Sequence, residues 1–274
     1  METDNSSFVH PLEILAPPLH QRGMGCCSAV AVAQCLAAMV QLIPGRRNDL
    51  RRHPSVQELV DKVQEVFPNH CSKVPGKGGF RSFSPETALD YIKLHGVSLE
   101  AYQSYCGQQT SRPTPPGCTR LWIQKYRHTV AGHVNIRPII HQHPIVGVFM
   151  TYRSIYRYRE GTVYQGAEHD DEKTNRLHAV VIFGYGNEER RDFYWIQNSW
   201  GEHWGCNGIG KVSSLLFVKF VYPDLEGISI SIPGLRRMEA ANVELKKRME
   251  AANVELKKMN GSSVAQTLNR ALSV

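Results

Sequence analysis

The sequence predicts an α+β fold in which helices and strands occupy different parts of the chain. Segments of the first hundred residues repeat their apolar positions at helical spacing, whereas short apolar runs rich in β-branched residues follow after about residue 110. Segregated elements of this kind are typical of the α+β class. A chain of 274 residues, with 42% hydrophobic and 21% charged residues, can bury a large core and is neither disordered nor fibrous.

Three segments of the first half have helical patterns, after an extended lead-in over residues 1–25 that is rich in Pro and Gly. Residues 28–42 are apolar, Ala-rich and free of Gly and Pro, which predicts a buried helix. Residues 56–67 space their apolar positions by three and four, as an amphipathic helix does. Residues 84–95 open with Ser-Pro-Glu, a favourable helix start.

Strands are predicted in the second half, at residues 145–150, 179–183 and 193–196. The eleven-residue string RMEAANVELKK then occurs twice, over residues 237–258. Its apolar residues form one helical face with little drift, because eleven residues make about three turns. We therefore expect a helical tail that either stays solvated or docks on a partner through residues 237–259.

The net charge is +7. The tail from Leu235 onward contains eight Lys and Arg but only four Glu, so it carries more than half of this charge and the main body is only mildly basic. No run reaches about 18 consecutive apolar residues, so no membrane span is predicted. The His pairs His141 with His143 and His128 with His133 are a weak signal for metal or nucleic acid. The sequence predicts no metal, no other cofactor and no nucleic-acid partner.

Seven cysteines are an odd number, and none form a CxxC pair, so a reactive thiol is one candidate. Cys27 directly precedes the predicted helix at residues 28–42. The free N–H groups and the dipole of a helix N-terminus stabilise negative charge and lower a thiol pKa. Cys27 is therefore the candidate nucleophile.

Three strings resemble the active-site segments of the papain-like cysteine protease family, which are QRGMGCCSAV at 21–30, LHAVVIFGYG at 177–186 and YWIQNSWGEHWGCNG at 194–208. The resemblance spans about residues 11–223, with an insertion around 107–142. It implies a two-lobe fold with a helical N-terminal lobe and a β-barrel-like C-terminal lobe. We expect a protease domain at 1–223 and a linker with a helical tail at 224–274.

The resemblance assigns a role to each matching residue. It implies that Cys27 is the nucleophile, that His178 is the general base and later the general acid, and that Asn198 orients the imidazole. Gln21 would donate its side-chain NH₂ to the oxyanion, together with the backbone N–H of Cys27. These roles imply a cysteine endopeptidase that acts through an acyl-enzyme.

Substrate contacts are also implied by the resemblance. Gly78 and Gly79 would offer their backbone to an extended peptide, and Trp200 would cover the contact between His178 and Asn198. The implied partner is a peptide or protein substrate.

Departures from the family pattern leave a second function open, a pseudoprotease that binds peptides or a protein without turnover. Ser28 stands where an aromatic residue normally follows the nucleophile, and Met24 replaces a disulfide cysteine. The strand before Asn198 is one residue short, which would turn that side chain away unless a bulge compensates. Family members are typically lysosomal, vacuolar or extracellular, but neither a signal peptide nor a pro-segment is visible here.

Overall fold

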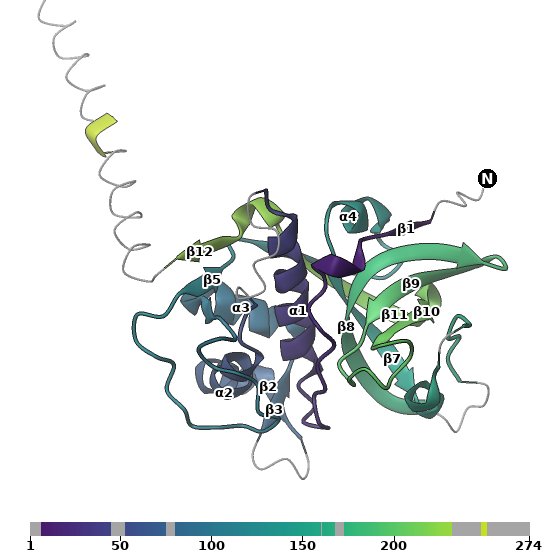
Figure 1. Cartoon of the computed structure of the whole chain (residues 1–274), viewed down its shortest axis with the longest axis horizontal. Coiled ribbons are helices and arrows are strands. Elements are labelled where there is room, and N and C mark those ends of the chain that lie inside the picture. The colour runs from purple at the N-terminus through teal and green to yellow at the C-terminus, as the bar shows by residue number, and fades with distance from the viewer. Residues whose placement is uncertain are drawn as a thin grey trace, which may run out of the picture. The chain divides into compact units, whose positions relative to one another are not determined.

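The computed structural model describes residues 7–44, 53–74, 80–159, 161–167, 173–231 and 248–250. The chain divides into two units, Met1–Ile230 and Ser231–Val274. In the first unit, the three longer helices gather in one lobe, and a seven-stranded sheet with one short helix forms the other (Figure 1). The predicted α+β fold with two lobes is thus confirmed. Of the predicted repeat helix at 237–259, only residues 248–250 are described, and they are helical.

Three helices build the first lobe, and each matches its predicted range to within one residue: α1 (Cys27–Leu42), α2 (Val56–Val66) and α3 (Pro85–His95). Side-chain hydroxyls cap α2 and α3, because Ser55 accepts from the N–H of Glu58 and Ser84 from that of Thr87. Helix α3 ends at Gly96, whose φ of +66° favours glycine and where a Cβ would lie 2.7 Å from the Trp122 ring.

Short elements complete this lobe. A hairpin of β2 and β3 forms beside α2, and a small three-stranded sheet has the order β12-β5-β4. The bounds are η3 (Pro68–His70), β2 (Cys71–Lys73), β3 (Arg81–Phe83), β4 (Val97–Ser98), β5 (Arg120–Trp122), η7 (Leu225–Gly227) and β12 (Ser229–Ser231).

The second lobe is an antiparallel sheet with the order β10-β9-β8-β7-β11-β6, and β1 pairs with β8 off this path. Strands β7, β8 and β9 contain the three predicted strands. Over the described residues the sheet is open, with β10 and β6 at its edges. The bounds are β1 (Phe8–Val9), η1 (Leu12–Ile14), β6 (Tyr126–Val130), α4 (Arg137–Gln142), β7 (Ile145–Tyr152), η4 (Arg153–Arg157), β8 (Lys173–Glu188), β9 (Arg191–Gln197), β10 (Ile209–Ser213), η6 (Ser214–Leu216) and β11 (Phe217–Pro223).

The sheet separates two hydrophobic cores, because side chains along a strand point alternately to its two faces. On β8, Ala179 and Val181 pack with α1 in the first core, whereas Val180 and Ile182 belong to the second core inside the sheet lobe. Helix α1 is buried almost along its whole length between the other helices and this sheet. Its Ala-rich sequence suits that position, because small side chains let the backbone approach closely.

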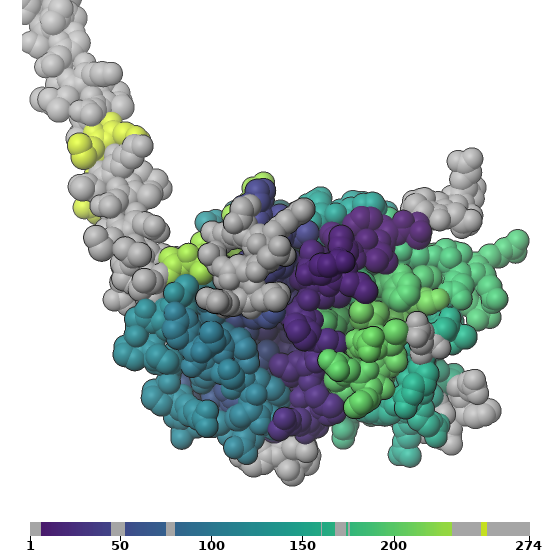
Figure 2. Space-filling model, viewed as in Figure 1, coloured from purple at the N-terminus to yellow at the C-terminus, as the bar shows by residue number. Residues whose placement is uncertain are grey.

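The N-terminal segment connects the two lobes before it enters α1. It runs between them along the surface shown in Figure 2, where it is purple. The backbone N–H of His10 donates to the Phe183 carbonyl at 3.0 Å, and the Gln197 amide donates to the Ala16 carbonyl at 2.6 Å. These hydrogen bonds therefore hold to β8 and β9 the segment that precedes Cys27 and the start of α1.

A buried carboxylate joins the elements of the helical lobe. Glu58 of α2 is fully buried and accepts hydrogen bonds from the Tyr91 hydroxyl at 2.8 Å and the Ser98 N–H at 2.9 Å. Arg120 of β5 forms an ion pair with it and also donates to the carbonyls of His95 and Gly96 at the end of α3. The Arg120–Glu58 pair thus links α2, α3 and β5.

We predict that Arg120→Met lowers the free energy of unfolding by about 3–5 kcal/mol, because it leaves the Glu58 carboxylate buried without its cation. Arg127→Met is the matched control. The Arg127 side chain is 70% exposed and lies 3.4 Å from Asp224, so its loss should cost less than about 1 kcal/mol. Urea denaturation of both variants measures the difference, and equal losses would contradict the prediction.

Candidate active site

Cys27 is the first residue of α1, at the junction of the two lobes. Its side chain is half-buried, and Cys26 occupies the preceding N-cap position. The first N–H groups of a helix have no partner within the helix, so they remain available to a negative charge at its N-terminus. This location is the one predicted from the helix that follows Cys27.

The surroundings of Cys27 favour its thiolate. Burial alone would raise the pKa of the thiol, but a hydrogen bond to His178, the charge of that imidazole and the N–H groups of Ala179 and Ser28 together lower the pKa below its ordinary value. The neighbouring thiol behaves in the opposite way, because burial raises the pKa of Cys26 to about 12. Of these adjacent cysteines, Cys27 is therefore the one whose thiolate is stabilised.

A hydrogen bond of 2.7 Å joins His178 Nε2 to Asn198 Oδ1. The same oxygen accepts the backbone N–H of Ser199 at 2.8 Å. Because a backbone N–H can only donate, the Asn198 atom that faces His178 must be its oxygen, and His178 Nε2 must carry a hydrogen. The neutral imidazole therefore keeps Nδ1 free to accept the thiol proton.

The register between β8 and β9 brings these two side chains together. The pairing shifts between Ile182 and Gly184, which is the signature of a β-bulge at Phe183. The short strand before Asn198 was expected to turn that side chain away unless a bulge compensated. The structure contains such a bulge, and Asn198 contacts His178.

Aromatic rings shield this pair from water. Trp200 lies over His178 with ring centroids 4.7 Å apart, and Tyr156 stacks on Trp200 at 4.6 Å. Asn198 is fully buried and His178 is only 5% exposed. A hydrogen bond in such a site is stronger than one in water, because the local dielectric constant is low.

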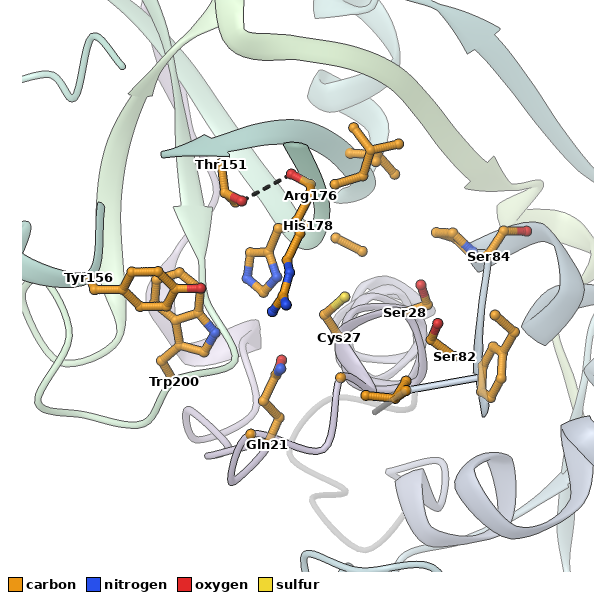
Figure 3. A pocket seen from close by; sticks show the side chains of 18 of the residues that line it. Gln21, Cys27, Ser28, Ser82, Ser84, Thr151, Tyr156, Arg176, His178 and Trp200 are labelled. Carbon is orange, nitrogen blue, oxygen red and sulfur yellow. Dashed lines mark hydrogen bonds between the residues drawn. The ribbon is translucent and has the colours of Figure 1, made fainter. Parts of the chain in front are cut away.

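Gln21 is held by contacts that the sequence did not reveal. The Ser199 hydroxyl donates to Gln21 Oε1 at 2.6 Å, and the Gln21 backbone N–H donates to the Ser199 carbonyl at 2.8 Å. The Tyr105 hydroxyl donates to the Gln21 carbonyl at 3.0 Å. Because the side-chain oxygen is occupied, the NH₂ group is left for a ligand, and Figure 3 shows the Gln21 side chain extending towards Cys27 and His178.

The sequence pointed to Ser199 more clearly than to Tyr105, the two residues whose side chains support Gln21. Ser199 directly follows Asn198 in the recognised string, so its position gave a clue although its contact did not. Tyr105 lies in the segment 102–107, which also resembles the family, but its contact with Gln21 spans 84 residues and had no sequence signal.

A cleft of about 910 Å³ runs past these groups. Its lining includes four of the predicted site residues, Gln21, Cys27, His178 and Trp200, while Asn198 lies behind the imidazole. Phe83, Val148 and Ala179 add apolar surface. The remaining predicted residues, Gly78 and Gly79, lie outside the described residues.

Disulfides, metal sites and membrane-spanning helices are further features for which the described residues can be inspected. Cys71 and Cys118, which fall near a disulfide pair of the recognised family, are free thiols. Within the described ranges, His, Cys, Asp and Glu form no group of three that could hold a metal ion. The described helices also include none with the length and apolar character needed to cross a membrane.

Known proteins resemble this chain in sequence. A family model described as papain family cysteine protease matches residues 11–215. Cathepsin J of Rattus norvegicus is 28% identical over 212 residues, which cover 73% of this chain and 57% of the relative. Peptidase 1 of Euroglyphus maynei is 31% identical over 201 residues, with the same two shares. The chain thus spans little more than half the length of these relatives.

Solved structures support the fold. The proCathepsin B S9 of Trypanosoma congolense gives a TM-score of 0.63 at 18% identity, covering 81% of this chain and 79% of that one. The bromelain protease from Ananas comosus, in complex with the E64 inhibitor, gives 0.57 at 20% identity, covering 77% and 94%. At these identities the likeness concerns the fold alone, and it confirms the predicted papain-like architecture.

We predict that iodoacetamide alkylates Cys27 with a pH midpoint below the value of about 8.5 that is usual for a thiol, because His178 and the helix N-terminus stabilise the thiolate. His178→Ala should move the midpoint upward, and Cys106→Ser should leave it unchanged. Peptide mapping by mass spectrometry follows the modification. A midpoint at or above the usual value in the parent protein would contradict the assigned environment of Cys27.

Proposed function

Because the chain belongs to the papain family of cysteine proteases, we propose that it is a thiol endopeptidase in which Cys27, His178 and Asn198 form the catalytic triad. The observation that supports this most is the chain of contacts from the Cys27 thiol through His178 to Asn198, with the thiol pKa lowered. A nucleophile, its base and a group that orients the base are what acyl transfer through a thiol requires.

In the first half-reaction, the Cys27 thiolate attacks the carbonyl carbon of the scissile peptide bond, and the π electrons move to the carbonyl oxygen. The backbone N–H of Cys27 and the side-chain NH₂ of Gln21 donate to the resulting oxyanion. His178 then gives its Nδ1 proton to the leaving nitrogen, the C–N bond breaks, and the amine departs. The product is a thioester on Cys27.

In the second half-reaction, His178 Nδ1 takes a proton from water, and the hydroxide oxygen attacks the thioester carbonyl. The same two donors hold the second oxyanion. Its collapse breaks the C–S bond, which releases the carboxylic acid and leaves the Cys27 thiolate with a protonated His178. Asn198 keeps the imidazole in one orientation throughout, and Trp200 keeps water away from the Nε2–Oδ1 bond.

We further propose that residues 1–223 act as the protease domain and that the repeat at 237–259 is a helix that contacts a partner. The substrate-binding roles of Gly78 and Gly79 also remain proposals. The alternative function uses the same cleft to bind peptides without hydrolysis. Ser28 supports this alternative, because Ser28 lines the cleft beside Cys27 at a position where family members carry an aromatic ring.

The decisive experiment measures hydrolysis of a casein or quenched-peptide substrate by the full chain. Cys27→Ala should lower kcat/KM by at least about 10⁴-fold, because no other group forms the acyl-enzyme. Cys106→Ser, which removes a thiol outside the cleft, should stay close to the parent. Labelling of Cys27 by an epoxide-type cysteine protease inhibitor should be stoichiometric. Peptide binding without any turnover, unchanged in Cys27→Ala, would reject the endopeptidase and support the binding protein.

A second prediction concerns the oxyanion donors. Gln21→Ala should lower kcat by about 10²–10³-fold with little change in KM, because the side-chain NH₂ acts on charge that develops only in the transition state. Ser199→Ala should lower kcat in the same direction but by less, about tenfold, because Gln21 is then only misoriented. Steady-state kinetics with one peptide substrate measures both. A KM effect without a kcat effect would show that Gln21 binds the ground state instead.

A further inference from the structure

The ionised side chains that line the cleft in the described part of the chain are basic. Among the described lining residues there is neither Asp nor Glu, whereas four are cationic and three are histidines: Lys73, Arg159, Arg176, Lys219, His20, His178 and His203. Lys219 is neutralised by Glu86 at 2.6 Å. Lys73, Arg159 and Arg176 are exposed, and within the described part of the chain no carboxylate pairs with them.

Arg176 is placed by a rigid strand close to the reacting groups. It lies two residues before His178 on β8, so both side chains leave the same side of the strand about 7 Å apart. The Thr151 hydroxyl donates to the Arg176 carbonyl at 2.9 Å (Figure 3). The Thr174 hydroxyl donates to the Thr151 carbonyl at 2.8 Å. The backbone at Arg176 is therefore fixed, and its charged end is exposed in the cleft.

The other two cations stand on separate elements of the cleft wall. Lys73 ends β2 in the helical lobe, where β2 pairs with β3. Arg159 follows η4, and its guanidinium is steadied by a hydrogen bond to the Tyr158 carbonyl at 3.0 Å. Arg159 shares the cleft lining with Tyr156 and Trp200. Positive charge thus comes from both lobes and not from one surface patch.

We propose that this cleft selects acidic peptide segments, with Asp or Glu side chains near the scissile bond, and that Arg176 is the main residue that determines this specificity. The proposal rests on the proposed function of the same cleft, since it names the class of substrate that Cys27 acts on. A cleft lined by charges of one sign concentrates the opposite charge and raises the association rate of such ligands.

The geometry of an extended peptide fits this arrangement. Its residues advance by about 3.3 Å each, and alternate side chains point to the same side. An acidic side chain one or two residues from the bond that Cys27 attacks can therefore reach the guanidinium of Arg176. Because Arg176 has a fork of N–H donors, it can bind that carboxylate through two parallel hydrogen bonds.

The test uses pairs of quenched fluorogenic peptides that differ only in Glu against Gln at the two positions on each side of the scissile bond. The parent protein should cleave the Glu peptide with a kcat/KM about tenfold higher at low ionic strength, and added salt should reduce this ratio. Arg176→Glu should reduce the ratio by about tenfold or reverse it, and Arg159→Glu should reduce it less.

Arg112→Glu is the matched control, because it makes the same change in net charge at an exposed residue that does not line the cleft. It should keep the preference of the parent protein. Circular dichroism and thermal melting check that each variant is folded. A loss of preference in Arg112→Glu as large as in Arg176→Glu would show a general charge effect and overturn the role of Arg176.

Binding of the same labelled peptides to Cys27→Ala, measured by fluorescence anisotropy, separates this proposal from the proposed function. Tighter binding of the Glu peptide supports the acidic preference even if the parent protein hydrolyses neither peptide. Cys27-dependent cleavage without any difference between Glu and Gln peptides overturns the preference and leaves the protease assignment standing. Equal binding of the two peptides, including no binding of either, also overturns the preference.

Discussion

The hydrogen bond between His178 Nε2 and Asn198 Oδ1 is the interaction on which the site depends. It sets the tautomer of the imidazole, and the tautomer decides which nitrogen is left for Cys27. The two residues come from β8 and β9, so the bond exists only because the two strands pair in one register with a bulge between Ile182 and Gly184. A shift by one residue would move every side chain of β9 to the opposite face and separate Asn198 from His178.

The position of Cys27 depends on how α1 is packed. Cys27 has a useful environment because α1 begins at that residue, and α1 holds its position because almost all its side chains are buried between α2, α3 and the sheet. Ala179 and Val181 of β8 pack in the same core as α1. The strand that carries His178 is therefore also the strand that supports the helix carrying Cys27. Packing energy and catalytic geometry are coupled at this contact.

Local patterns predicted much of the fold and the residues of the candidate site. Three helices were predicted to within one residue, because burial of one face and the Gly, Pro and Ser signals at their ends are local properties. Strand β6 and helix α4 were missed: β6 has no fully buried residue and α4 only Ile140, so their sequences lack a periodic apolar signal. The quoted strings singled out Cys27, His178, Asn198 and Gln21, which the structure brings together. The support of Gln21 by Ser199 and Tyr105 requires contacts across 178 and 84 residues.

The charge of the cleft could not be predicted from the sequence either, because it depends on which distant residues lie together. The net charge of +7, more than half of which lies after Leu235, indicated a mildly basic main body and no preference for a charged partner. Charge acts on a ligand through its position, however, and exposed charges separated by more than about 8 Å are largely screened at physiological salt. The three cations come from different segments of the sequence: Lys73, Arg159 and Arg176. They lie at one cleft only because both lobes contribute to its lining. Because Glu86 neutralises Lys219 while these three have no such partner among the described residues, the local field at the cleft differs from what the net charge suggests.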